Sequence, residues 1–313
     1  MKKKSPNKKL RSGLLTCVRS PSVTDLRVTH AHSLEPRQNL RAIRANNANF
    51  SRHSPGCPPG LLCNTDFVNL RAKLHHFTYY LFPGQCILCK NLTYRQLDLC
   101  LACELDLPWL RNCCPYCAEP SADLLPCAGC LQKPPNFSAT LIGFEYRFPI
   151  NALVHAFKDS RHLASGYVLT HLAYSRHRQT LSNISGEDLL VVPVPLHARK
   201  SRARGFNQSH LIAEQLANLI PAKLDQTLLY RVIDTPDQKS LPLASRKHNL
   251  KNSFEVKRDL KGDRILLVDD VVTTGATITE ISLRLLQSGA SDVVVFAVAR
   301  TPPPKPIMPD LLQ

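Results

Sequence analysis

Eight of the 12 cysteines form four Cys-x-x-Cys pairs within a short segment of the chain. The pairs are Cys86/Cys89, Cys100/Cys103, Cys114/Cys117 and Cys127/Cys130. A two-residue spacer lets both thiolates of a pair face one ion, and two pairs complete a tetrahedral shell of four sulfurs, which suits zinc. No histidine or carboxylate ligand is spaced with them, so we expect structural zinc, one ion or two.

Two other uses of such cysteines fit less well. Disulfides need an oxidising compartment, and Lys2–Lys4 is not followed by the apolar core of a secretory signal. A redox dithiol of the thioredoxin kind uses a single pair. We therefore expect a reducing, cytoplasmic location. The spacing leaves two arrangements open: sequential pairing into two ribbons, or a cross-brace that joins the first pair to the third. Cys113 lies outside the pairs.

An acidic pair and a threonine- and glycine-rich segment indicate a second kind of chemistry. Asp269 and Asp270 follow the apolar run Ile265–Val268. The residues after them that suit phosphate are Thr273, Thr274, Gly275, Ala276 and Thr277. Backbone N–H groups at a helix start and threonine hydroxyls bind phosphate, whereas carboxylates accept hydrogen bonds from sugar hydroxyls or bind Mg²⁺.

Together these residues predict a ribose 5-phosphate site. A Walker A loop is excluded because the segment has no Gly-Lys-Thr/Ser. The plainer alternative is a helix-capping turn with solvent-facing acids, which would leave the acids at the end of a buried strand unexplained.

A basic loop, Pro195–Gly205, carries four cationic side chains. They are Arg199, Lys200, Arg202 and Arg204. Guanidinium and ammonium groups placed near a bound phosphate would form a pyrophosphate clamp. They would serve equally as contacts to a DNA backbone, or the loop is simply solvated.

Strands and helices that would position these residues alternate from about residue 139. We expect strands at 140–146, 188–194, 264–268 and 292–298, and helices at 150–157, 207–220 and 276–287. This alternation predicts an α/β fold: a parallel sheet with helices on both faces, preceded by a small cysteine-rich zinc-ribbon module. In open α/β sheets, ligands bind at the carboxyl ends of the strands, where both loops would lie.

Composition limits the class of protein. Hydrophobic residues make up 43% of the chain, which excludes a wholly disordered protein. The chain has 40 Lys and Arg against 24 Asp and Glu, a net charge of +16, which favours an anionic partner such as phosphate or nucleic acid. The longest apolar run, Val293–Ala299, is too short to cross a bilayer, so we expect no membrane insertion.

The first 75 residues contain 14 Lys and Arg but three acids, and they lack a sustained helix or strand period. We expect residues 1–75 to be a disordered leader or to precede a misplaced start near Val68 or Leu70. A transit peptide and a nucleic-acid-binding arm are the alternatives. The other expected divisions are a zinc module at 80–135, the α/β domain at 139–302 and a tail at 303–313.

Two resemblances add to these observations. Ile265–Thr277 resembles the phosphoribosyl-pyrophosphate (PRPP) signature of type I phosphoribosyltransferases. From about residue 80 to 301, the chain resembles the ComF/GntX family of competence-associated proteins. Besides the cysteine pairs and the PRPP signature, the matching segments are Leu131–Pro135, Val192–Pro195, Arg204–Ser209 and Arg246–Phe254.

The resemblance implies a zinc module followed by a type I phosphoribosyltransferase fold that binds PRPP with Mg²⁺. It implies that Asp269 and Asp270 meet the ribose hydroxyls and that Thr273–Thr277 hold the 5-phosphate. Thr235–Asn249 would form a flexible flap whose Arg246 and Lys247 close over pyrophosphate. The activity implied is phosphoribosyl transfer linked to DNA uptake or to the use of DNA-derived nucleobases. Single-stranded DNA and proteins of the competence machinery are the implied partners.

A rival hypothesis is a non-enzymatic accessory or scaffold protein that binds single-stranded DNA and keeps PRPP as a regulatory or vestigial ligand. The sequence indicates neither an acceptor pocket nor a catalytic base. We interpret His155 and His197 as packed or solvated histidines and not as catalysts.

Overall fold

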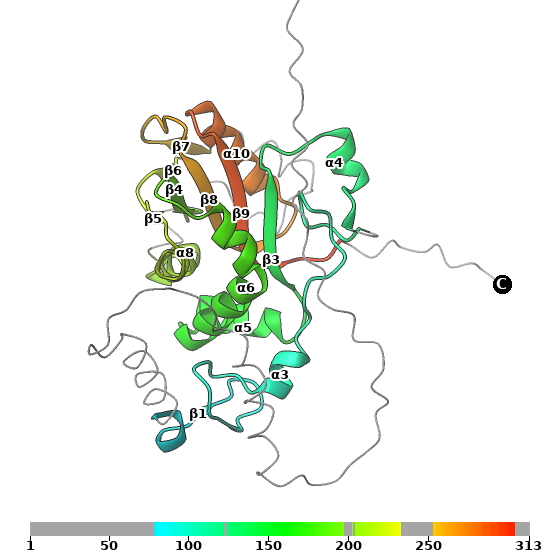
Figure 1. Cartoon of the computed structure of the whole chain (residues 1–313), viewed down its shortest axis with the longest axis vertical. Coiled ribbons are helices and arrows are strands. Elements are labelled where there is room, and N and C mark those ends of the chain that lie inside the picture. Colours follow the sequence, from blue (N-terminus) through cyan, green and yellow to red (C-terminus); the bar gives the residue numbers. More distant parts are fainter. Residues whose placement is uncertain (1–77, 122–123, 197–201, 203, 233–252, 304–313) are drawn as a thin grey trace, which may run out of the picture. The chain divides into compact units, whose positions relative to one another are not determined.

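The structure is a computed structural model, and only part of the chain can be described from it. The described residues are 78–121, 124–196, 202, 204–232 and 253–303. Several predictions therefore fall outside them: the leader, Arg199, Lys200, His197, the flap with Arg246 and Lys247, and most of the tail. The chain divides into Met1–Leu74 and His75–Gln313, and every described element belongs to the second unit (Figure 1).

Five parallel strands form the central sheet, in the order β3-β9-β8-β4-β5. Their bounds are β3 Ala139–Glu145, β9 Asp292–Arg300, β8 Arg264–Val272, β4 Leu189–Pro193 and β5 Lys223–Leu224. Every residue of β4 is buried, and so is β9 after its first residue. Such continuous apolar runs are typical of parallel strands that are covered on both faces.

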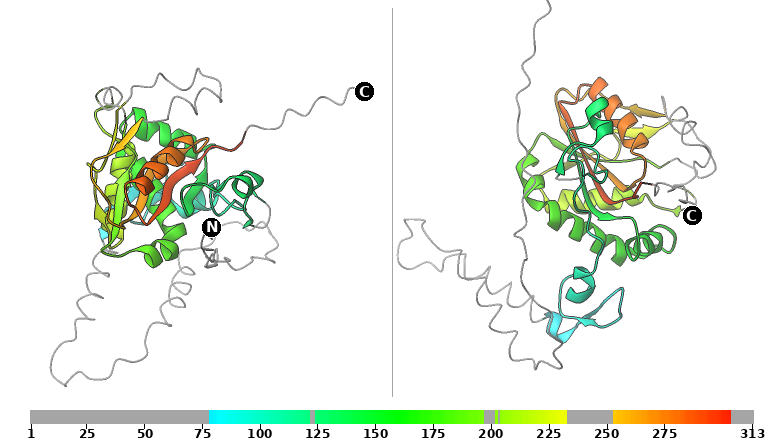
Figure 2. Two further views of the ribbon diagram at one scale, coloured as in Figure 1. Left: turned by 90° about the horizontal axis from the view of Figure 1, so that it is seen from above. Right: turned by 90° about the vertical axis from the view of Figure 1, so that its right-hand side faces the viewer.

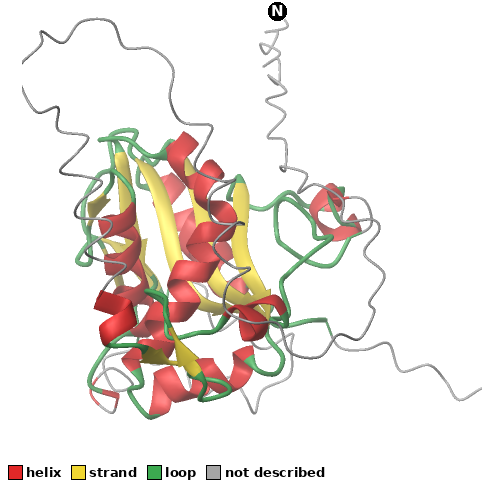
Figure 3. Cartoon of the chain, turned by 60° about the horizontal axis from the view of Figure 1, so that its bottom comes forward, coloured by secondary structure: helices red, strands yellow, loops and turns green. Residues whose placement is uncertain are grey.

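Helices cover both faces of this sheet, as predicted (Figure 3). The helices are α5 Ile150–Asp159, α6 Leu163–Ile184, α8 Gln208–Leu219 and α10 Ala276–Gln287. The first three share one apolar core with alternate residues of the strands, and α10 shares the other core. The short antiparallel pair β6 (Leu229–Arg231) and β7 (Phe254–Val256) packs into the core on the α10 face.

The predicted end of one strand was wrong. We expected the strand to stop at Val268 and the acids to lie in the following loop. Instead β8 continues to Val272, and Asp269, Val271 and Val272 remain in register with β9. The two β-branched valines suit an extended strand, and β9 itself runs to Arg300, which supplies the partner residues. The loop proper is therefore limited to 273–275.

The cysteine-rich module consists of two ribbons, which we define as the first ribbon (residues 84–103) and the second ribbon (residues 114–130). The first contains the antiparallel pair β1 (Gly84–Gln85) and β2 (Leu92–Thr93) and the start of α3 (Leu101–Leu105), while α4 (Ala128–Gln132) begins in the second. The first ribbon shares the core of α5, α6 and α8, and the second shares that of α10 (Figure 1, Figure 2).

The segment between the ribbons is attached to β3. Leu110 N–H donates to the Gly143 carbonyl at 3.0 Å, and Glu145 N–H donates to the Pro108 carbonyl at 2.8 Å. The Trp109 ring lies against Phe144 with 4.6 Å between centroids. Edge strands expose unpaired backbone groups, so this segment also covers part of the free edge of the sheet.

Candidate functional site

The eight paired cysteines form two clusters of four sulfurs, each cluster within 4.8 Å. The first contains Cys86, Cys89, Cys100 and Cys103, and the second contains Cys114, Cys117, Cys127 and Cys130. The structure thereby selects sequential pairing over the cross-brace. Two closed sets of four thiols with no additional ligand fit two structural zinc ions.

Both ribbons repeat one knuckle geometry. The residue after the second cysteine of the leading pair has a left-handed backbone: φ is 66° at Lys90 and 58° at Ala118. Its N–H donates to the carbonyl of the first cysteine, at 2.9 Å in each ribbon. The tight turn directs both sulfurs of the pair toward one point, which is the arrangement that a shared ion requires.

The thiols of each cluster have unequal acidity. Burial opposes ionisation of Cys86, but the backbone N–H groups of Cys100, Cys89 and Leu88 outweigh it and lower the pKa to about 6. Burial raises the pKa of Cys117 to about 11. Four crowded thiolates repel one another, so a cation is needed before all four can ionise together.

The acidic pair lies where the strand order of the sheet reverses. From β4 the chain passes through α8 to β5 at one edge, whereas β8 and β9 lie on the other side of β4. Val194 N–H donates to the Val268 carbonyl at 2.8 Å, directly before Asp269. In open α/β sheets, the ligand crevice forms at this switch point. The structure therefore brings Asp269, Asp270 and the start of the basic loop to the same edge.

Each acid has a specific partner from another element. The Ser209 hydroxyl on α8 donates to Asp269 Oδ1 at 3.1 Å, and Lys158 Nζ on α5 lies 2.7 Å from Asp270 Oδ2. Burial, with the nearby charge of Asp270, raises the pKa of Asp269 to about 7. A carboxyl whose pKa is raised by burial beside a second acid is common where groups are arranged for chemistry.

The predicted phosphate loop, Thr273–Thr277, leads directly into α10. Gly275 caps the helix with φ of 76°, a conformation that other residues rarely adopt. Thr273 and Thr274 are exposed, and the Thr279 hydroxyl donates to the Gly275 carbonyl at 2.9 Å. The first N–H groups of a helix have no partner within it, so the loop offers donors and the positive end of the helix dipole to an anion.

The second ribbon borders this loop. A cavity of about 560 Å³ is lined on the ribbon side by Cys117 and Gly129, and on the other side by Thr274, Gly275 and Thr279. The Thr140 hydroxyl on β3 donates to the Tyr116 carbonyl of the ribbon. The second ribbon is therefore hydrogen-bonded to the sheet and faces the phosphate loop across this cavity.

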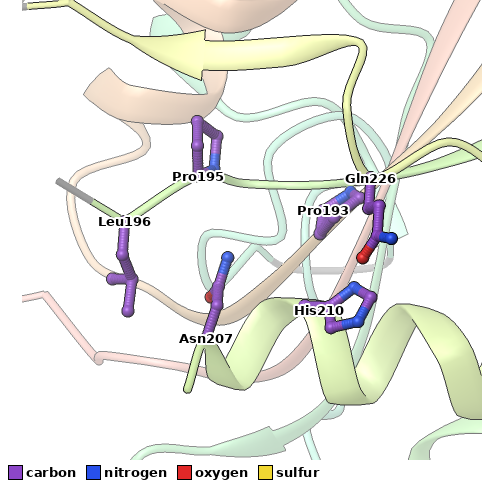
Figure 4. Close-up of a pocket in the computed structure, with 6 residues that line it drawn as sticks. All are labelled: Pro193, Pro195, Leu196, Asn207, His210 and Gln226. Atoms are coloured by element: carbon purple, nitrogen blue, oxygen red, sulfur yellow. The ribbon is translucent and has the colours of Figure 1, made fainter. Parts of the chain in front are cut away.

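The basic loop is described only at its two ends. At its start, Pro195 and Leu196 line a cavity of about 240 Å³ together with Asn207, the N-cap of α8, and His210 of that helix (Figure 4). At its end, Arg204 is half-buried and donates to Gln208 Oε1 at 3.3 Å. The expected clamp by Arg199 and Lys200 stays a prediction, because both lie outside the described residues.

Two residues that contact the acids, Lys158 and Ser209, were not predicted from sequence, and neither was Arg161 beside the basic loop. Lys158 lies in the last turn of α5. Arg161 follows just after this helix, and its guanidinium lies against Gly205 at the end of the basic loop. Ser209 lies at the start of α8. A signal for the two cations was the short segment Lys158–Arg161, which follows directly on the expected helix at 150–157.

These features define a protein with a double zinc ribbon and a parallel α/β domain that carries an acidic pair and a threonine- and glycine-rich loop at the carboxyl edge of its sheet. A family model described as double zinc ribbon domain matches residues 77–131. The DNA utilization protein YhgH of Salmonella typhimurium is 36% identical over 225 residues, which cover 70% of this chain and 98% of that protein. The competence protein F of Haemophilus influenzae is 30% identical over 228 residues, again 70% and 98%. The chain belongs to the family of these proteins, and its predicted ComF/GntX membership is confirmed.

Similarity to solved structures is weaker. The purine phosphoribosyltransferase of Pyrococcus horikoshii superposes on 42% of this chain and 80% of its own, with 16% identity and a TM-score of 0.23. A TM-score this low does not support a conclusion about function. Among the described helices, none is both long enough and apolar enough to span a membrane.

Proposed function

We propose that this chain binds PRPP with Mg²⁺ at the carboxyl edge of its sheet and transfers the phosphoribosyl group to a nitrogen acceptor. The observation that carries this proposal is the acidic pair, Asp269 and Asp270, which lies at the switch point of the sheet and shortly before the Gly275 turn of the phosphate loop. A ribose 5-phosphate presents hydroxyls and a phosphate, and the site offers carboxylate acceptors for the hydroxyls and N–H donors for the phosphate.

In the transfer, the bond from C1 of the ribose to the pyrophosphate oxygen breaks as C1 forms a bond to the acceptor nitrogen. Pyrophosphate leaves with the electron pair, and the nitrogen loses a proton to solvent. Asp269 and Asp270 would orient the ribose diol. The positive charges of Arg204 and of Arg199, Lys200 and Arg246 would stabilise the leaving group. Mg²⁺ would neutralise charge on the pyrophosphate when it is bound.

The names of the relatives suggest a setting for this activity. They refer to DNA utilization and to competence, so the acceptor we propose is a nucleobase derived from DNA taken up by the cell. A reducing cytoplasm is the compartment that we propose, since eight clustered thiols would otherwise oxidise.

The test is isothermal titration of the zinc-loaded protein with PRPP and Mg²⁺. Wild type should bind at micromolar concentrations, and Asp269→Asn/Asp270→Asn should bind at least about tenfold more weakly because the ribose acceptors lose their charge. Asp259→Asn, an exposed acid on the same domain, is the matched control and should bind like wild type. Absence of binding to folded, zinc-loaded wild type would overturn the proposal.

A second function is favoured by the surface beside the first ribbon. Tyr80 and Phe82 are 76% and 79% exposed, and Tyr94 lies 5.3 Å from Tyr80 between ring centroids. Exposed aromatic rings on a chain of net charge +16 suit single-stranded DNA, whose bases stack on such rings. Fluorescence anisotropy with a labelled oligonucleotide would test it. Tyr80→Ala/Phe82→Ala should weaken binding, while Leu105→Ala, also exposed, should not.

A further inference from the structure

Lys158 forms a short and shielded ion pair with the acidic pair. Its ammonium lies 2.7 Å from Asp270 Oδ2, and the two side chains are only 19% and 15% exposed. The pair joins α5 to β8, and its two residues are 112 positions apart in the sequence. Ion pairs that lose most of their solvent contact need good geometry to form at all, so this contact is a built feature of the site and not a surface coincidence.

The end of α5 is fixed in place by packing. Phe157, the residue before Lys158, is buried and lies 5.8 Å from the Phe206 ring between centroids. Arg161 packs so closely on Gly205 that a Cβ there would lie 2.7 Å from its Nη2. The same short segment thus contacts both the acidic pair, through Lys158, and the end of the basic loop, through Arg161.

Asp270 has both carboxylate oxygens engaged in this structure. Oδ1 accepts the Val271 N–H at 2.6 Å, and Oδ2 accepts Lys158. Each carboxylate oxygen can accept more than one hydrogen bond, and an ammonium has three N–H donors. A ribose hydroxyl can therefore join Oδ2 while Lys158 remains beside it and directs another N–H toward an oxygen of the ligand.

We propose that Lys158 is a ligand-binding residue of the PRPP site, which orients Asp270 in the empty protein and donates to the ligand's phosphates once it is bound. The inference rests on the proposed function above. Lys158 thereby supplies a positive charge beside Asp270. Without it, a divalent ion would have to supply the positive charge that lets an anionic ligand bind next to two acids. Binding of PRPP then depends only weakly on Mg²⁺, and it becomes strongly dependent on Mg²⁺ when Lys158 is removed.

The experiment measures PRPP affinity of the full, zinc-loaded chain by isothermal titration, with Mg²⁺ and in magnesium-free buffer. A chelator is omitted so that the ribbons keep their metal. The variants are Lys158→Met, which keeps the length and loses the charge, and Lys158→Arg, which keeps the charge. Lys223→Met, an exposed lysine on the edge strand β5, is the matched control. Zinc content and the thermal midpoint of each variant establish that it is folded.

We expect wild type, Lys158→Arg and Lys223→Met to lose less than about threefold in affinity without Mg²⁺, whereas Lys158→Met loses about tenfold or more. If Lys158→Met shows the wild-type ratio between the two buffers, the inference is overturned even when its affinity falls in both, because a packing role would produce that pattern. If folded wild type binds PRPP in neither buffer, the proposed function itself fails, which is a separate result.

Discussion

Arg300, the last residue of β9, forms an ion pair with Glu119 of the second ribbon. The Arg300 side chain is 3% exposed, and its Nε and Nη1 have no hydrogen-bond partner in the described part of the chain. Arg300 is also in register with Val272, the last residue of β8. The ion pair therefore links the zinc module to β9, whose last residue pairs with the end of β8 just before the phosphate loop.

This arrangement predicts unequal effects when either partner is changed. Glu119→Gln leaves a buried guanidinium without its counter-charge and should lower the free energy of unfolding by about 1–3 kcal/mol. Arg300→Met replaces the guanidinium with an apolar chain of similar length and should cost less, since it also removes two unsatisfied donors. Urea unfolding followed by circular dichroism measures both. A larger loss for Arg300→Met than for Glu119→Gln would contradict this account of the contact.

The two clusters predict two zinc ions per chain. Cys89→Ser removes one ligand of the first cluster and should reduce the zinc content to about one ion, because a structural site needs its full set of four ligands. Cys113→Ser is the matched control, since Cys113 adjoins the second cluster but is not a member of it. Elemental analysis of the purified proteins gives the stoichiometry. One ion in wild type, or loss of zinc in Cys113→Ser, would contradict the assignment.

Much of the α/β domain was predictable because its strands are continuous apolar runs. The strands at β3, β4 and β9 and the helices α5, α8 and α10 follow the expected segments within about two residues, which is the usual uncertainty of helix and strand ends. The 22-residue helix α6 was not predicted. Its buried face includes Ser165, Gly166 and Thr170, so hydrophobic residues do not mark one side of it.

The site was predictable only where its residues are neighbours in sequence. Asp269, Asp270 and the phosphate loop form one continuous segment, and a local pattern reveals such a segment. Lys158 is 112 positions from Asp270 in the sequence, and Ser209 is 60 positions from Asp269, so only the fold brings them into contact. The pairing of the cysteine knuckles was open for the same reason: spacing limits which sulfurs can share an ion, but packing decides which do.

The raised pKa of Asp269 predicts a pH-dependent cost to stability. An ordinary aspartate has a pKa of 3.8, and burial raises that of Asp269 to about 7 in the folded chain. Between these values the unfolded chain loses a proton that the folded chain retains, so stability falls as the pH rises and the cost is complete above about pH 7. Asp269→Asn cannot ionise and avoids the cost, while its amide oxygen can still accept from Ser209.

Thermal midpoints of the ligand-free protein at about pH 5 and about pH 8 test this prediction. The midpoint of Asp269→Asn relative to wild type should be higher at the upper pH, by an amount that corresponds to about 1–4 kcal/mol. Asp259→Asn, which is exposed, should show no such difference. An equal effect of Asp269→Asn at both pH values would show that the change acts through packing and not through ionisation.

We expect the substitution Gly166→Ala to destabilise the protein, although alanine normally favours a helix more than glycine does. Replacing a helical glycine with alanine ordinarily stabilises a protein by about 0.5–1 kcal/mol. A Cβ at Gly166 in α6, however, would lie 2.5 Å from the Phe157 ring, which is fully buried and cannot move away freely. Gly166→Ala should therefore destabilise the protein by about 1–3 kcal/mol, the range typical of overpacked cores.

The displaced Phe157 ring should also affect the ligand site, because it precedes Lys158 and contacts Phe206. We expect Gly166→Ala to weaken the Lys158–Asp270 contact and with it PRPP binding in magnesium-free buffer. Asn183→Ala, an exposed position of the same helix, is the control and should be neutral or slightly stabilising. Chemical denaturation and the PRPP titration measure the two effects. A stability of Gly166→Ala at or above that of wild type would show that the end of α5 tolerates the shift, and that packing by Phe157 does not hold Lys158 in place.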